Sequence, residues 1–135
     1  MSQLLKNILG VIAGIVIGGF VNSSLVKLGH ILIPPPKGFD LETMEGLAAA
    51  MKEFTAIDFL MPFLAHAFGT LVGVFVAVKI SKSIHVAIPL IIGGFFLVGG
   101  IVMVTMVPSP LWFSALDLLV AYIPAAFLGA RLART

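Results

Sequence analysis

Residues 86–107 read VAIPLIIGGFFLVGGIVMVTMV and contain no charged side chain. At a rise of about 1.5 Å per residue, about 20 such residues cross the roughly 30 Å hydrocarbon core of a bilayer as one α-helix. Three more apolar segments of similar length, bounded by charges or prolines, cover residues 7–26, 59–78 and 111–130. Because helices satisfy their own backbone in lipid, the pattern predicts an all-α fold, a four-helix transmembrane bundle.

The composition agrees with a membrane protein. Of 135 residues, 60% are apolar and 10% are charged, whereas a soluble domain carries about 25% charged residues. The length predicts a single domain, residues 1–135. The segment 7–26 is longer than the apolar region of a signal peptide, about 7–15 residues, and we expect it to be an uncleaved first helix. The net charge of +2 is dispersed and does not indicate a nucleic-acid partner.

The basic residues fall unequally on the two sides of the predicted spans. One side carries Lys and Arg without acids: Lys6, Lys79, Lys82, Arg131 and Arg134. The other side mixes both signs: Lys27, Lys37, Lys52, Asp40, Glu42, Glu45, Glu53 and Asp58. Cytoplasmic loops of membrane proteins are enriched in Lys and Arg, so we expect both termini in the cytoplasm.

The long connection between the first two spans, residues 28–58, has a helical pattern of its own. It opens with Ile33-Pro34-Pro35-Pro36, which stays extended because proline cannot continue a helix. Asp40 is a candidate N-cap. Apolar residues then recur at helical spacing, at Met44, Leu47, Met51 and Phe54. The pattern predicts an outer amphipathic helix, which either shields the end of the bundle or forms a lid over an outer cavity.

Glycines form stripes on two of the spans. The first span carries Gly10, Gly14 and Gly18 at intervals of four residues, and the second carries Gly69 and Gly73. Small residues on one face of a membrane helix allow another helix to approach closely. We predict helix packing at these positions, within the bundle or between copies.

Polar side chains from three spans fall in one layer of the outer half of the membrane. Counted from the outer boundary, Asn22 lies about 7 Å, Asp117 about 10 Å and His66 about 12 Å deep. A buried aspartate costs roughly 2.5–3.5 kcal/mol to insert and needs a partner, so we expect Asp117 to pair with His66. Thr70 and Tyr122 lie nearer mid-membrane and extend the cluster inward. The five residues either join helices together or form an outward-facing binding or proton-handling site.

The sequence offers few groups for catalysis. Asp117 is the only acid within a span, there is no cysteine, and one deep histidine does not make a zinc site. No phosphate-binding or dinucleotide-binding motif occurs. We therefore predict a protein that is not an enzyme and has no cofactor or metal.

Three stretches resemble a group of short four-helix bacterial membrane proteins that have no assigned activity. The stretches are residues 33–36 with Gly38 and Asp40, residues 62–70, and residues 110–113 with Asp117 and 121–124. The resemblance implies a bacterial inner (cytoplasmic) membrane and four helices, and it implies no activity.

Two functional hypotheses remain. The first is a multi-pass membrane protein that binds or passes a small solute, ion or proton through a polar site around His66 and Asp117. The second is a structural or accessory subunit whose glycine-rich faces dock onto a second copy or a larger membrane complex. A cavity that reaches His66 favours the first hypothesis. A filled bundle with an exposed glycine face favours the second.

Overall fold

The computed structural model describes residues 1–83 and 85–135, and this part of the chain contains helices and no strand. The elements in chain order are α1 (Gln3–Leu32), α2 (Met44–Met51), the 3-10 helix η1 (Ala56–Phe59), α3 (Leu60–Ser81), α4 (Ala87–Met106), α5 (Leu111–Val120) and α6 (Ile123–Arg134). The predicted all-α fold is therefore confirmed.

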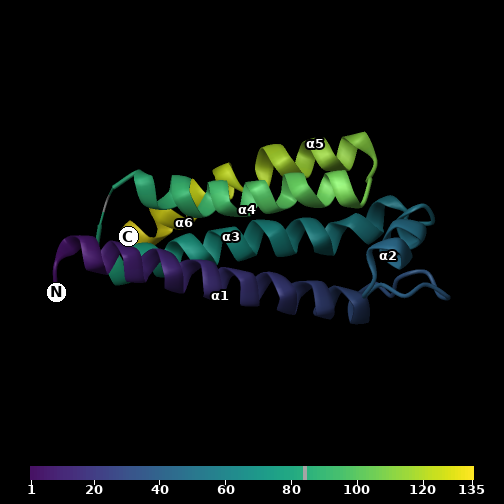
Figure 1. Cartoon of the computed structure of the whole chain (residues 1–135), viewed down its shortest axis with the longest axis horizontal. Helices are drawn as coiled ribbons and strands as arrows, with labels where there is room; N and C mark the ends of the chain where they lie inside the picture. Colours follow the sequence, from purple (N-terminus) through teal and green to yellow (C-terminus); the bar gives the residue numbers. More distant parts are fainter. Residues whose placement is uncertain (84) are drawn as a thin grey trace.

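Within the described residues, four helical segments are long and apolar enough to cross a membrane: Gln3–Leu32, Ala56–Ser81, Ala87–Met106 and Leu111–Arg134. They run back and forth along one axis, so that both termini lie at one end of the bundle and α2 lies at the other (Figure 1). The first helix continues well beyond the predicted end at residue 26. It ends at Leu32 because Ile33 precedes a proline, which disfavours the helical conformation, and Ile33 has φ −128° and ψ 85°.

The fourth span differs from the prediction of one continuous helix over residues 111–130. It is divided into α5 and α6 by a turn at Ala121 and Tyr122. Pro124 has no N–H to donate to the carbonyl of Val120, so the hydrogen-bond ladder is interrupted one turn before the proline. Tyr122 departs from helical geometry, with φ −111° and ψ −73°. The break lies at the depth of the polar residues and determines where Tyr122 points.

The predicted glycine stripes pack against each other inside the bundle. All five glycines are buried: Gly10, Gly14, Gly18, Gly69 and Gly73. A Cβ atom on Gly18 would lie 2.6 Å from the carbonyl oxygen of Gly69, and one on Gly73 would lie 2.6 Å from that of Gly14. The backbones of α1 and α3 are thus too close for any side chain at these positions.

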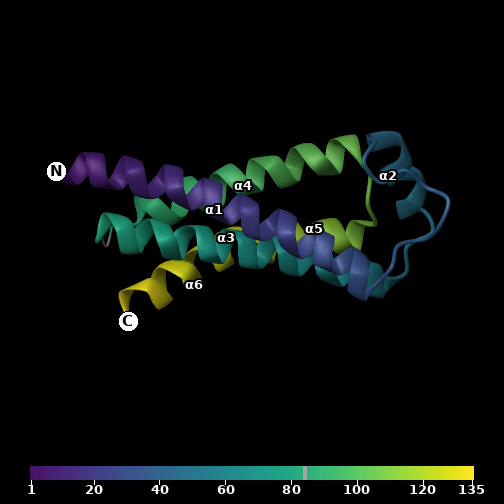
Figure 2. The same ribbon diagram turned by 90° about the horizontal axis from the view of Figure 1, so that it is seen from below.

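Small side chains fill the end of the bundle that holds the termini. The buried cluster there joins α3, α4 and α6 through Val74, Ile92, Ala126 and Ala130. Toward the other end, α1 and α4 diverge (Figure 2). The closely packed part of the protein therefore occupies one end, and α2 with its flanking segments covers the more open end.

A short helix occupies the connection between the first two spans, but it begins later than Asp40. Its N-cap is Thr43, whose hydroxyl accepts a hydrogen bond from the Gly46 amide at 3.0 Å. The expected capping role of Asp40 was wrong, because its carboxylate accepts from the Glu42 amide at 3.0 Å and forms the preceding turn.

Candidate functional site

His66 of α3 and Asp117 of α5 form a direct hydrogen bond. The His66 Nδ1 and Asp117 Oδ1 atoms are 2.8 Å apart, as the sequence predicted for this pair. Asp117 is 3% exposed, whereas the His66 side chain is 28% exposed. With Asp117 ionised, its carboxylate only accepts hydrogen bonds, and in that state Nδ1 carries the hydrogen and donates it. Asp117 thereby fixes the orientation of the imidazole ring.

Tyr122 completes a network around the same carboxylate. Its hydroxyl donates to Asp117 Oδ2 at 3.3 Å, and its ring stacks on the His66 ring at a centroid distance of 5.6 Å. Gly100 makes room for this arrangement, since a Cβ atom there would lie 2.6 Å from the Tyr122 hydroxyl. Each carboxylate oxygen of Asp117 therefore has its own donor.

The other two predicted residues lie beside this network without joining it. The Thr70 hydroxyl donates to the backbone carbonyl of His66 at 2.9 Å, a bond within α3. Asn22 of α1 packs on Gly69, one turn along α3 from His66. The Asn22 Oδ1 atom is buried and has no hydrogen-bond partner among the described residues. A buried amide oxygen without a donor is costly in free energy, which marks Asn22 as unusual.

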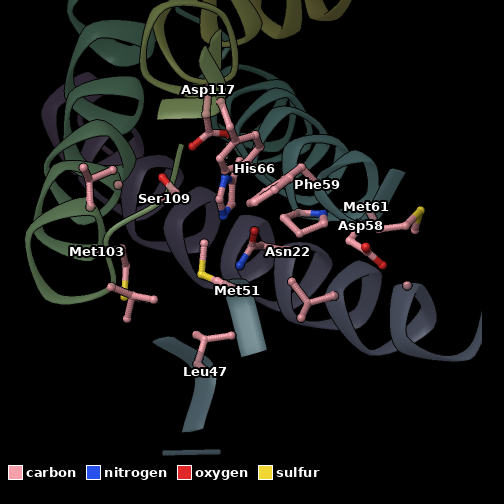
Figure 3. Close-up of a pocket in the computed structure, with 18 of the residues that line it drawn as sticks. Asn22, Leu47, Met51, Asp58, Phe59, Met61, His66, Met103, Ser109 and Asp117 are labelled. Atoms are coloured by element: carbon pink, nitrogen blue, oxygen red, sulfur yellow. Dashed lines mark hydrogen bonds and ion pairs between the residues drawn. The ribbon is translucent and has the colours of Figure 1, made fainter. Parts of the chain in front are cut away.

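All five predicted residues line one cavity of about 470 Å³. This volume falls in the range of roughly 300–1,000 Å³ found for small-molecule sites. Most of the wall is apolar, with side chains from several elements: Leu47, Met51, Phe59, Phe96 and Met103. In Figure 3 the imidazole ring lies between Asp117 and Asn22, and Met51 and Leu47 of α2 approach from the opposite side.

The apolar wall contains residues that sequence reasoning did not assign to a site. The helical spacing of Leu47 and Met51 marked one apolar face of α2, and both residues face the cavity. Phe59 and Met103 gave no comparable signal. An apolar residue in a membrane helix can face lipid, another helix or a cavity, and the sequence alone does not distinguish these environments.

The chemistry of the site is that of an oriented histidine. In residues 1–83 and 85–135, no group of three or more His, Cys, Asp or Glu side chains is placed to hold a metal ion. The second ring nitrogen of His66 points away from Asp117 and into the cavity on the side of Asn22 (Figure 3). With Nδ1 protonated, this Nε2 atom presents a lone pair that can accept a hydrogen bond or a proton.

Comparison of the chain with protein-family models, curated proteins and solved structures finds no match.

Proposed function

We propose that this chain is a multi-pass membrane protein that binds a small molecule in the cavity beside His66 and Asp117. One observation carries the proposal: a histidine oriented by a buried carboxylate presents its free nitrogen to a cavity of about 470 Å³. Largely apolar cavities with a few convergent polar groups are the usual form of small-molecule sites. Ionisable groups are costly to place within a membrane, and those found there usually have a function.

The cavity lies in the outer half of the membrane in this proposal. It is at the end of the bundle that α2 covers, opposite the termini (Figure 1). The excess of Lys and Arg near the termini supports a cytoplasmic position for that end, and we propose that the membrane is a bacterial inner membrane. Leu47 and Met51 then make α2 an amphipathic lid over the outer mouth of the cavity, with Glu45 exposed on its other side.

Binding is better supported than passage of an ion or proton. Between the polar network and the termini, the bundle is filled by apolar side chains such as Val74, Ile92 and Ala126, each at 0% exposure. An ion crossing this region would lose its hydration without gaining polar partners. The described residues therefore favour a site that is closed toward the end of the bundle that holds the termini.

The accessory-subunit hypothesis loses its main support. The glycine stripe that was its expected docking face is used internally, because Gly14 and Gly18 contact the backbone of Gly73 and Gly69. Gly19 on α1 and Gly94 and Gly99 on α4 have open space around them. Gly94 and Gly99 are five residues apart, so they do not lie on one face of α4 and form no stripe. A dry bundle with an exposed glycine face is not what the described residues show.

A thermal-shift screen of the purified protein in detergent tests the proposal. The panel contains soluble polar solutes, cations, anions and bilayer-soluble amphiphiles. At 100 times the dissociation constant, a ligand stabilises the folded state by about 2.7 kcal/mol, enough to raise the melting temperature measurably. We expect at least one class to stabilise the wild type, and His66→Ala to lose the shift.

His85→Ala is the matched control, since His85 is an exposed histidine that does not line the cavity. It should retain the full shift. The proposal fails if no class in the panel shifts the wild type, or if His66→Ala responds as the wild type does.

A further inference from the structure

We infer that the ligand is a single-chain amphiphile dissolved in the bilayer, with a hydrogen-bond-donating head group that lies between Asn22 and His66. This inference rests on the proposed function and names its ligand class. It has three parts, which concern the head group, its charge, and the route by which the molecule reaches the cavity.

The polar end of the cavity presents two acceptors. The Asn22 Oδ1 atom is buried and unpaired among the described residues. The His66 Nε2 atom faces the same space, because Nδ1 is bonded to Asp117. A head group that donates hydrogen bonds, such as a hydroxyl or an amine, satisfies both atoms. A head group that only accepts leaves both without a partner.

The charges around the cavity disfavour an anion. Among the described residues, its wall includes the carboxylates of Asp58 and Asp117 and contains no Lys or Arg. The Asp58 carboxylate is engaged locally, accepting from the backbone N–H and the hydroxyl of Thr55 at 2.7 Å and 3.0 Å. A carboxylate or phosphate head group would approach these two carboxylates. The basic side chains among the described lining residues are two histidines, His30 and His66, and His66 is already bonded to Asp117. Neutral and cationic head groups do not meet this repulsion.

The remainder of the wall suits a hydrocarbon chain. Leu47 and Met51 of α2, Met61 of α3, and Phe96 and Met103 of α4 are apolar, and three of these five side chains are flexible methionines. Methionine adapts its shape to an irregular apolar neighbour, as an unbranched chain requires. The wall thus offers dispersion contacts along the ligand and hydrogen bonds at one end only.

The route from the bilayer lies between α1 and α4. These two helices diverge toward the end of the bundle that α2 covers (Figure 2). Gly99 and Met103 of α4 both line the cavity and are both exposed. At Gly99, the position of a side chain is open space. An amphiphile can therefore enter sideways from the lipid without crossing an aqueous phase.

Competition between head groups tests the ligand class. The protein in a nonionic detergent is mixed with equal amounts of a long-chain primary alcohol, the amine and the fatty acid of the same chain length. Bound species are measured by native mass spectrometry. We expect the bound amounts of the alcohol and of the amine each to exceed that of the acid by about tenfold. This is the ratio in affinity that one unsatisfied hydrogen bond or one charge repulsion produces.

Asn22→Leu separates the head-group contact from folding. The leucine keeps the Cβ atom that packs on Gly69 and removes the unpaired Oδ1 atom. We expect its melting temperature without ligand to equal or exceed that of the wild type, while its affinity for the alcohol falls about tenfold. An unchanged affinity for the alcohol would refute the role of Asn22.

Gly99→Leu tests the route, with Gly94→Leu as its matched control. Both glycines are on α4 and both have open space for a side chain, but only Gly99 lines the cavity. In lipid nanodiscs, Gly99→Leu should slow binding of the alcohol severalfold and Gly94→Leu should not. Equal rates in the two variants would overturn lateral access.

The outcomes distinguish this inference from the proposed function. Binding of the fatty acid as strongly as the alcohol overturns the ligand class and leaves a binding protein. If soluble solutes bind and no amphiphile competes with them, the ligand class is likewise overturned and the protein is still a binding protein. If nothing in the wider thermal-shift panel binds, the proposed function fails and this inference fails with it.

Discussion

The energetic coupling between His66 and Asp117 can be measured with a double-mutant cycle. The His66→Ala variant leaves a carboxylate that is 3% exposed, with only the 3.3 Å bond from Tyr122. The Asp117→Ala variant leaves an imidazole nitrogen without its 2.8 Å partner. Because hydrogen bonds to charged groups contribute about 1.5–3 kcal/mol, we expect each single variant to lose about 2 kcal/mol of unfolding free energy.

The double variant should lose less than the two single losses together, because neither partner remains to be stranded. Hydrogen bonds between membrane helices show couplings that average about 0.6 kcal/mol and reach about 1.7 kcal/mol. A short bond to a nearly fully buried carboxylate belongs at the upper end of this range. We therefore expect a coupling of about 1.5 kcal/mol, so that each single variant loses more than half of what the double variant loses.

The assay is equilibrium unfolding in mixed micelles with increasing sodium dodecyl sulfate, followed by far-ultraviolet circular dichroism. Tyr122→Phe serves as the internal reference, since it removes one 3.3 Å hydrogen bond to the same carboxylate and should cost only about 0.5 kcal/mol. Losses that add within about 0.5 kcal/mol would show that the two side chains are energetically independent, and the proposed site would lose its central contact.

Two further predictions concern packing and orientation. Gly14→Leu and Gly18→Leu should each lose about 3 kcal/mol of stability, because the new side chain meets a backbone carbonyl of α3, whereas Gly99→Leu should melt within a few degrees of the wild type. Wild-type melting of both stripe variants would contradict the close packing of α1 on α3. A cysteine introduced as Lys37→Cys, in a chain with no other cysteine, should react with a membrane-impermeant reagent in intact cells. Labelling only after lysis would reverse the orientation.

The spans and their packing faces could be predicted because each is determined by one physical constraint. A helix that crosses lipid needs about 20 apolar residues, and a close helix contact needs small ones, so hydropathy and the spacing of Gly14 and Gly18 were sufficient. The contact between His66 and Asp117 followed from depth alone. Both residues are costly in lipid, and helix rise places them in the same layer.

The details that were not predicted depend on the folded chain, because the local sequence allows more than one structure at these positions. Asp40 and Thr43 are both good N-caps, and only the folded chain shows that Thr43 caps α2 while Asp40 stabilises a turn. Pro124 breaks the fourth span, and nothing in the sequence indicated that the break would turn Tyr122 toward Asp117. The cavity was beyond sequence reasoning, because its volume depends on how far α1 and α4 diverge.

Asn22 connects the packing of the bundle with the proposed site. Its Cβ atom packs on Gly69, within the glycine contact that joins α1 to α3, so the backbone at this position is fixed. A leucine has nearly the same shape and would avoid an unpaired buried amide oxygen, which costs about 1–3 kcal/mol. The asparagine is therefore a poor choice for stability in the empty protein. Its amide faces the cavity beside the free nitrogen of His66, and a donor bound there would offset that cost. A binding residue is expected to be unfavourably buried when no ligand is present and to have a complementary group beside it in the cavity. Asn22 meets both conditions. A residue that only joined helices would instead have its hydrogen-bond partner within the bundle.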